Sequence, residues 1–262
     1  MKTFNDIINN YITSPDFLNK NIEDLVMFAY KEGCVDTAFI YDQYGQILEA
    51  DREEFTKNLN PNGHDYVDLG LPSGTLWATM NIGATSPEQY GDYFAWGETT
   101  PKDSYSWDNY KYGNAPIALI KYCNNSAYGK DEYTDNFTEL ELGDDAARVN
   151  WGGDWRMPTK AQVQELIGNT TSAWTNDFNN TGISGVTFIS KTNNNTMFIP
   201  AAGYFETTVD GVGAGGYLWC SALGSSYPYG AWYLNFGNNK VDLMSYYSRY
   251  CGRSVRGVLC GD

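Results

Sequence analysis

The C-terminal part of the chain interleaves apolar positions with tyrosine and small polar residues. Between residues 216 and 258 the apolar positions recur at strand-like spacing. They include Trp219, Ala231, Leu234, Phe236, Val241 and Leu243. Residues 216–252 also contain seven Tyr, five Ser, five Gly and three Asn. Tyr supplies stiff, amphipathic contact area, while Ser, Gly and Asn supply adaptable hydrogen bonds. This pattern favours a recognition surface on a rigid scaffold, and it leaves open an ordinary Tyr-rich sheet edge with turn residues.

Residues 1–60 have a different pattern, which predicts a small helical and hairpin module. Apolar residues recur at helical spacing from Phe4 to Ile12, and a second apolar helix face lies between Asn21 and Gly33. Residues 37–48 are typical of a short hairpin, and a turn-rich stretch follows at 58–63. We therefore expect an N-terminal module over residues 1–60 and a larger domain over residues 65–262.

The larger domain is expected to consist of short strands separated by turns. Residues 66–84 alternate apolar with small or polar residues, and residues 187–203 predict a hairpin that turns at 191–195. The polar stretch 100–136 is too long for a plain connector, so we expect an ordered insertion. Thr159 can cap a helix, whose buried stripe would be Val163, Leu166 and Ile167.

Six segments occur in an order that resembles a known family. They read YVDLGLPSGTLWATMNIGA, GDYFAWGET, WGGDWRMPT, FIPAAGY, GYLWCSA and RSVRGV. Over about residues 65–259 they resemble the Bacteroidetes domain often called the Fibrobacter succinogenes major paralogous domain. That domain is similar to the formylglycine-generating-enzyme branch of the C-type lectin fold. The resemblance implies an α+β, C-type lectin-like fold with twisted antiparallel sheets, one or two helices and many ordered loops.

The family motifs carry over to particular scaffold positions of this chain. The matching residues are Trp151, Trp155, Arg156, Trp219, Ser221, Val255 and Arg256. Leu218 and Cys220 depart from the family's Y-W-S-S pattern around Trp219. Arg156 and Arg256 are expected to be buried partners of strands or loops, whereas Arg249 lies among the tyrosines and is expected to contact a ligand.

The same fold hosts the variable proteins of diversity-generating retroelements. In those proteins, substitutions accumulate near the C-terminus at codons with adenines, which can come to encode Tyr, Ser, Asp, Gly or Cys. The resemblance implies such a variable region at about 216–252, binding a protein or glycan on a cell surface. The expected contact residues are Leu218, Cys220, Ala222, Ser225, Ser226, Tyr227, Tyr229, Tyr233, Asn235, Asn238, Asp242, Ser245, Tyr246, Tyr247, Ser248, Arg249, Tyr250 and Cys251. A fixed-specificity bacterial surface adhesin or lectin-like module is the alternative, and an oxidase of the formylglycine-generating type comes third.

The net charge and the hydropathy of the chain restrict the classes of partner that it can bind. The net charge is −15, with 32 acids against 17 bases. Nucleic acid and anionic membrane surfaces both require positive potential, so neither is an expected partner. No apolar run approaches the roughly 18 residues of a membrane-spanning helix, and the first residues show no signal-peptide core. We expect a chain displayed on a phage virion or a cell surface, from a Bacteroidetes bacterium or its phage.

Candidate chemistry is sparse, and we expect no catalytic residue and no cofactor. The five Cys form no C-x-x-C, and the single His64 stands in the boundary turn. The resemblance to formylglycine-generating enzymes would require a reactive, copper-binding Cys pair, for which Cys220 and Cys251 match by residue type alone. The E-P-N, Q-P-D and W-N-D strings of calcium-dependent lectins do not occur. A structural calcium held by loop carbonyls and acids remains an open alternative.

Overall fold

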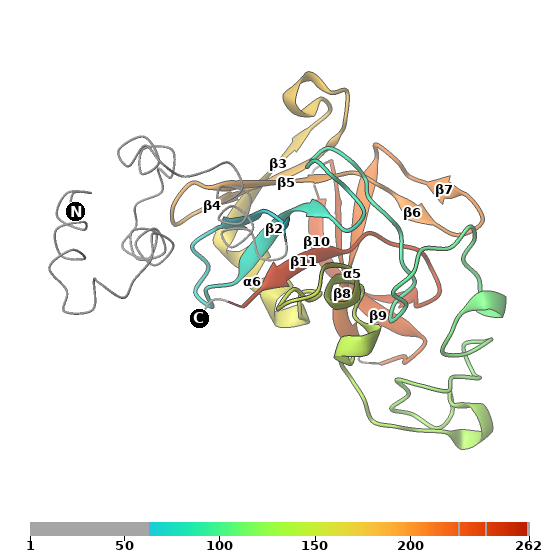
Figure 1. Ribbon diagram of the computed structural model, residues 1–262. Coiled ribbons are helices and arrows are strands. Elements are labelled where there is room, and N and C mark those ends of the chain that lie inside the picture. The colour runs from blue at the N-terminus through green and yellow to red at the C-terminus, as the bar shows by residue number, and fades with distance from the viewer. Residues whose placement is uncertain (1–62, 225, 239, 261–262) are drawn as a thin grey trace, which may run out of the picture. The chain divides into compact units, whose positions relative to one another are not determined.

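The computed structural model describes residues 63–224, 226–238 and 240–260. The chain separates into two units, and all described residues except Gly63 belong to the second, His64–Asp262. The N-terminal module predicted over residues 1–60 lies outside the described residues. The second unit is an α+β domain of mostly antiparallel sheets with few helices (Figure 1), which confirms the predicted class.

The domain contains short strands and few helical segments. The strands are β1 (Tyr66–Asp68), β2 (Leu76–Asn81), β3 (Thr170–Thr175), β4 (Gly185–Ser190), β5 (Thr196–Pro200), β6 (Tyr204–Phe205), β7 (Val209–Asp210), β8 (Gly215–Leu223), β9 (Gly230–Gly237), β10 (Lys240–Ser248) and β11 (Arg256–Leu259). The α-helices are α5 (Ala146–Trp151) and α6 (Lys160–Asn169). The 3₁₀ helices are η3 (Trp107–Asn109), η4 (Lys130–Glu132), η5 (Leu142–Asp144) and η6 (Phe178–Asn180).

The first and last strands of the described residues share a sheet. Its order is β1–β2–β11, with both pairs antiparallel. The central strand β2 contributes the buried Trp77 and Ala78, and β11 is buried along its whole length. The C-terminal strand is therefore part of the core and joins the two ends of the domain.

The predicted hairpin over residues 187–203 is confirmed by β4 and β5. These strands pair antiparallel from Gly185 to Ile189, and the turn between them spans 191–195. Strand β3 pairs with the other side of β4, giving the order β3–β4–β5. Strand β3 is not predicted from the sequence, because its residues TTSAWT show no apolar alternation.

Helix α6 begins as the sequence predicts. Thr159 is its N-cap and accepts a hydrogen bond from the backbone of Gln162, whose side chain completes a capping box. Val163 and Leu166 are buried as predicted, while Ile167 is only half-buried. Gln162 is also buried. Its side-chain amide is satisfied there, because it donates a hydrogen bond to the Thr75 hydroxyl at 2.9 Å.

Helix α5 was not predicted as a helix, although its cap is visible in the sequence. The Asp145 carboxylate accepts from the backbone N–H groups of Ala147 and Arg148 at 2.9 and 3.0 Å. It also accepts from the N–H of Met157 at 2.8 Å, across the loop that follows the helix. A single buried carboxylate therefore fixes both α5 and the segment leading to α6.

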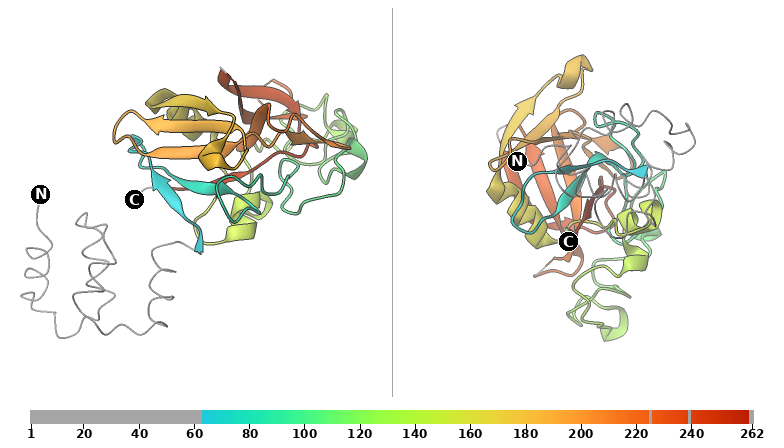
Figure 2. Two further views of the ribbon diagram at one scale, coloured as in Figure 1. Left: turned by 90° about the horizontal axis from the view of Figure 1, so that it is seen from above. Right: turned by 60° about the vertical axis from the view of Figure 1, so that its left-hand side comes forward.

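The stretch from 100 to 136 is ordered, as expected. It carries η3 and η4 and contributes the buried Tyr105, Tyr110 and Tyr122 to the core. In Figures 1 and 2 this green segment lies on the side of the domain away from the turn between β4 and β5. Among the residues that the structure describes, no helix has both the length and the apolar character needed to cross a membrane.

Candidate ligand-binding face

The third sheet, ordered β10–β9–β8, divides the tyrosine-rich segment between two faces. Residues paired across an antiparallel sheet point to the same side. Leu218 and Leu234 are paired in a row that packs into a core cluster with residues of α6 and β4. Tyr217, Asn235 and Asp242 form a row on the opposite face, where their side chains remain partly or fully exposed.

Six of the expected contact residues are buried, so their predicted exposure is wrong. They are Leu218, Cys220, Ala222, Tyr233, Arg249 and Cys251, none of which is more than 7% exposed. Leu218 and Cys220 belong to the core cluster on the face toward α6. Ala222 pairs with Glu139, which leads from the insertion toward α5. Four of the six lie on β8 or β9, and residue type and spacing do not reveal the layers that cover that sheet.

The other expected contact residues keep some exposure wherever they are described. The partly or fully exposed ones are Ser226, Tyr227, Tyr229, Asn235, Asn238, Asp242, Tyr247, Ser248 and Tyr250. Ser225 and the side chains of Ser245 and Tyr246 lie outside the described residues. The candidate binding face is therefore narrower than the predicted one, and the row from Tyr217 to Asp242 lies within it.

Four aromatic rings on this face surround the buried side chain of Arg253. The guanidinium carbon lies 3.7 Å from the ring centre of Tyr233 and 4.3 Å from that of Tyr247. The ring centres of Trp219 and Tyr217 follow at 4.7 and 5.0 Å. A guanidinium is attracted to the electron-rich faces of such rings. Arg253 therefore fixes the orientation of the tyrosines that line the face.

Among the residues that the structure describes, ring faces and not a carboxylate surround the charge of Arg253. It is fully buried, and within the described residues none of its guanidinium nitrogens has an oxygen partner. Burial raises the pKa of the Cys251 thiol to about 12, and the charge of Arg253 beside it opposes that rise. The role of Arg253 is not predictable from the sequence, because the rings around it come from three strands, β8, β9 and β10.

A carboxylate lies at the edge of the same face. Glu206 accepts from the hydroxyls of Tyr247 and Tyr250 at 3.4 and 3.3 Å. Burial raises the pKa of Tyr247, and the charge of Glu206 adds to that rise. The Tyr204 ring packs edge-on against Tyr217 at 5.5 Å, which extends the aromatic surface beyond β8. Neither Tyr204 nor Glu206 was predicted, because both lie outside the segment 216–252.

A second group of tyrosines surrounds the loop between β8 and β9. The rings of Tyr227 and Tyr229 are stacked with their centres 5.5 Å apart. Tyr128, from the insertion, lies 5.6 Å from Tyr229 and 6.2 Å from Tyr227. The N–H of Arg249 donates to the carbonyl of Tyr229 at 3.0 Å, which joins this loop to the end of β10. The tyrosines of this loop and those around Arg253 are therefore both attached to β8, β9 and β10.

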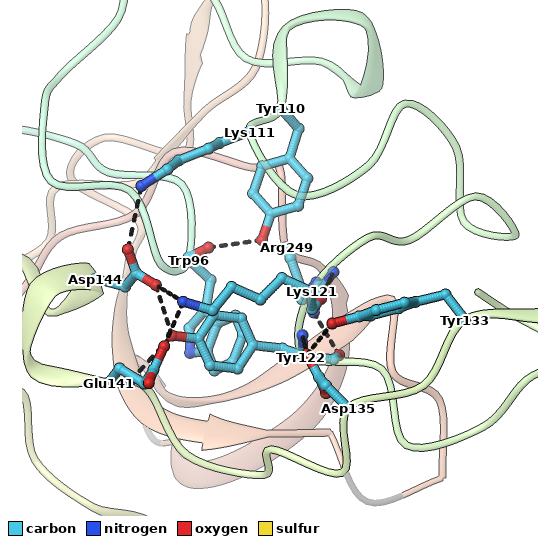
Figure 3. Close-up of polar contacts among 10 residues, drawn as sticks. All are labelled: Trp96, Tyr110, Lys111, Lys121, Tyr122, Tyr133, Asp135, Glu141, Asp144 and Arg249. Atoms are coloured by element: carbon cyan, nitrogen blue, oxygen red, sulfur yellow. Dashed lines mark hydrogen bonds and ion pairs between the residues drawn. The ribbon is translucent and has the colours of Figure 1, made fainter. Parts of the chain in front are cut away.

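Arg249 holds the insertion and does not face solvent (Figure 3). Its guanidinium donates to the carbonyls of Tyr122 and Lys121 at 2.8 and 3.2 Å, and its carbon lies 5.5 Å from the ring centre of Trp96. A guanidinium has five N–H donors, so neighbouring backbone carbonyls of a loop can accept several hydrogen bonds from it. The side chain expected to contact a ligand is therefore an internal anchor.

Figure 3 also shows a charged cluster that fastens the same insertion. Asp144 accepts from Lys121 at 2.6 Å, from the Tyr122 hydroxyl at 2.7 Å and from Lys111 at 3.1 Å. Burial alone would raise the pKa of Asp144, but these donors lower it well below the usual value. Asp135 caps the loop by accepting from the N–H of Tyr122 at 2.6 Å.

Of the seven residues that match the motifs of the resembling family, all except Arg156 are buried. Trp219 is fully buried and donates from its indole to the carbonyl of Phe94 at 2.8 Å. Ser221 donates to Glu139 at 2.6 Å, and Val255 is fully buried. Trp151 and Trp155 enclose Gly257 so closely that a Cβ there would lie 2.9 Å from both rings.

The two motif arginines differ in burial. Arg256 is fully buried, as predicted, and donates to Asn81 Oδ1 and the Ala78 carbonyl at 2.9 and 3.0 Å. Arg156 is only half-buried and donates to Gln162 at 3.0 Å and to the Cys260 sulfur at 2.7 Å. Both still connect different parts of the chain, which is the role expected of them.

The described cysteine thiols and His64 are not arranged as a nucleophilic site or a metal site. Burial raises the pKa of the Cys220 thiol far above its usual value. A thiol with a raised pKa is a poor nucleophile at neutral pH. His64 is half-buried and stacks on Trp151 with ring centres 4.0 Å apart, and this burial lowers its pKa. Over the described ranges, no three His, Cys, Asp or Glu side chains gather where they could hold a metal ion.

Comparison with known proteins adds no relative to this picture: no family model, no curated protein and no solved structure matches the chain.

Proposed function

We propose that the chain is a non-catalytic ligand-binding protein with a C-type lectin-like fold, whose C-terminal sheet carries the recognition face. The α+β architecture and the buried positions of Trp219, Val255 and Arg256 support the proposal, because they are the scaffold positions of the resembling family. The same sheet keeps a separate face of tyrosine, asparagine and aspartate side chains partly exposed.

The observation that carries the proposal is the aromatic cage around Arg253. The tyrosines of the face rest on a buried cation and on one another, with Tyr217 and Tyr233 ring centres 6.2 Å apart. Rings held in place lose little conformational entropy when they bind a ligand. A preorganised aromatic face with polar neighbours such as Asn235 and Asp242 is typical of a recognition surface.

The proposed ligand is a protein or glycan on a cell surface. Tyrosine rings can pack on either kind of ligand, while Asn235, Asp242 and Glu206 supply hydrogen-bonding groups. The acids at this face and the net charge of −15 disfavour nucleic acid as a ligand. Binding of this kind requires no catalytic residue and no cofactor.

We further propose that the face belongs to the variable protein of a diversity-generating retroelement. On this account, variation is confined to exposed positions, since substitution of buried ones would disrupt the core. The proposed variable positions are therefore the exposed residues outside the Arg253 cage, which are Ser226, Tyr227, Tyr229, Asn235, Asn238, Asp242, Ser248 and Tyr250. Tyr247 is left out because its ring packs on Arg253. The buried positions from Leu218 to Cys251 should remain constant.

Sequencing the genomic neighbourhood of the gene tests this proposal. The expected result is a nearby copy of the 3′ end that differs from the gene only at adenines, beside a reverse-transcriptase gene. The adenine mismatches should fall on codons of exposed residues such as Tyr229 and Asn235. Absence of both the copy and the reverse transcriptase would overturn the variable-protein proposal and leave a fixed-specificity adhesin as the better account.

A further inference from the structure

The carboxylate at the edge of the recognition face belongs to a separate hairpin. Glu206 lies between β6 and β7, which are labelled in Figure 1. The ring of Phe205 packs inward against Tyr93 and Tyr105. Neighbouring side chains of an extended segment point to opposite sides, so Tyr204 and Glu206 point outward. The Glu206 carbonyl accepts from the N–H of Tyr105 at 2.8 Å, which fixes the segment to the domain.

Two tyrosine hydroxyls hold the Glu206 carboxylate among partly exposed rings. Tyr247 and Tyr250 both donate to Oε1, at 3.4 and 3.3 Å. The ring centre of Tyr204 lies 6.0 Å from that of Tyr247, and the ring centre of Trp107 lies 5.2 Å from that of Tyr250. All five side chains are partly exposed. A ligand group that reaches the carboxylate therefore also meets aromatic rings.

The charge of Glu206 has no basic partner within the described part of the chain. None of the ion pairs there includes Glu206, and its only side-chain hydrogen bonds are the two to Oε1. An ionised carboxylate has about four acceptor sites on its two oxygens, so half of this capacity is unused. Asp242, by contrast, already pairs with Lys240 at 3.2 Å. Glu206 is therefore better placed than Asp242 to accept from a ligand.

The surroundings of Glu206 favour a cation as the ligand group. Asp210 pairs with Tyr204 across the hairpin, so their side chains share a side, and Asp210 is exposed. The whole chain has a net charge of −15. A negative surface attracts basic partners and repels acidic ones. Tyrosine rings add to this preference, because their faces attract ammonium and guanidinium groups.

We propose that Glu206 and the rings of Tyr204, Tyr247 and Tyr250 bind a basic side chain, arginine or lysine, of a partner protein. The cationic group donates to the Glu206 carboxylate and packs on the rings. This inference rests on the proposed function, and it selects a protein with exposed basic residues as the ligand. Glu206 and Tyr204 lie outside residues 216–252, so this contact is the same whichever residues occupy the proposed variable positions.

Fluorescence anisotropy with the full chain and a labelled synthetic peptide tests the proposal. In the probe peptide, arginine alternates with serine. The comparison peptide has citrulline at every arginine, because citrulline keeps the shape of the side chain and lacks its charge. Saturable binding of the arginine peptide is expected, with at least about a tenfold loss of affinity for the citrulline peptide. Absence of binding, or equal binding of the two peptides, overturns the proposal.

Matched variants separate this site from attraction by the net charge alone. Glu206→Gln should weaken binding of the arginine peptide at least about fivefold. Asp154→Asn removes the same charge from a side chain that is 96% exposed after α5, and it should change affinity less than about twofold. Tyr204→Leu should bind about two- to fivefold more weakly than Tyr204→Phe, which keeps the ring. Thermal melts establish that each variant folds. Equal losses for Glu206→Gln and Asp154→Asn, or equal affinities of the two Tyr204 variants, would refute the site.

Selection of random peptides on the immobilised full chain distinguishes failure of this inference from failure of the proposed function. Selected peptides are expected to contain arginine or lysine and to bind Glu206→Gln more weakly than the parent. Asn235→Lys places a long side chain in the middle of the exposed row. Peptides without a basic residue that Asn235→Lys displaces would retain the recognition face and overturn this inference. Peptides that neither variant weakens would overturn both the inference and the recognition face as a protein-binding surface.

Discussion

Arg253 and Tyr233 form a stacked pair at the centre of the C-terminal sheet, with the guanidinium carbon 3.7 Å from the ring centre. Arg253 lies in the segment that pairs with Phe94, whereas Tyr233 lies in the middle of β9. The pair therefore joins the irregular segment after β10 to the strand that carries the recognition face. If the pair of Arg253 and Tyr233 is stable, the exposed tyrosines are held in fixed positions.

Truncation of Arg253 should destabilise the domain strongly. Arg253→Ala removes the cation from four rings and leaves a cavity, and the free energy of unfolding should fall by about 3 kcal/mol. Arg253→Lys keeps the charge but loses the planar stack, and it should cost about 1–2 kcal/mol. Urea denaturation measures both. Arg148→Lys, at a partly exposed position, is the control and should change stability by less than about 0.5 kcal/mol. Parent-like stability of Arg253→Lys would show that stacking is unimportant.

Loss of the α6 cap should have a smaller, local effect. Thr159→Ala removes the acceptor for the N–H of Gln162 and should lower the free energy of unfolding by about 1 kcal/mol. Thr159→Ser retains the hydroxyl and should remain within about 0.5 kcal/mol of the parent. Chemical denaturation of the two variants side by side tests this expectation, and equal losses would exclude the cap as the cause.

Asp144 should make the domain sensitive to acid. Its pKa is lowered in the folded protein, so its stabilising effect is present above the unfolded pKa of about 4 and is lost as the pH falls toward the lowered folded pKa. Asp144→Asn should cost about 2 kcal/mol at pH 7. It should also flatten the decline in stability below about pH 4. Glu141→Gln, at a half-exposed partner of Lys121, serves as the control. An unchanged pH dependence in Asp144→Asn would contradict this assignment.

The described cysteines should differ in reactivity. Cys260 is exposed, whereas Cys220 and Cys251 are fully buried with raised pKa values. Brief alkylation of the native protein at pH 7, followed by peptide mapping, should label Cys260 well before the buried Cys123, Cys220 and Cys251. Rapid labelling of Cys220 or Cys251 would instead favour the oxidase alternative, because that chemistry needs an accessible thiolate.

The features that could be predicted from the sequence are those that depend on residues close together in the chain. The cap at Thr159 and the hairpin turning at 191–195 depend on neighbouring residues, and both are present. Strand β3 was missed because an exposed edge strand needs no apolar alternation. Helix α5 was missed although Asp145 marks its start, since six residues are too few to show a helical period.

The candidate face was predicted only in part for a different reason. Tyr227 and Tyr233 are the same residue type in the same segment, yet one is 41% exposed and the other 7%. The difference depends on the insertion and on the Arg253 segment, both of which are distant in the sequence. The Arg249 side chain is buried for the same reason, because its acceptors are carbonyls at 121 and 122.

The division of the C-terminal segment into a tolerant face and an intolerant scaffold is the central claim of this account. Cell-surface display of the full chain, with each position from 216 to 258 randomised singly and scored for protease resistance, tests it most directly. Most substitutions should preserve resistance at the exposed set outside the Arg253 cage, which is Ser226, Tyr227, Tyr229, Asn235, Asn238, Asp242, Ser248 and Tyr250. Few should do so at the buried set, which is Leu218, Cys220, Tyr233, Arg249, Cys251, Arg253 and Arg256. Equal tolerance of the two sets would contradict the claim that a rigid scaffold supports a variable recognition face.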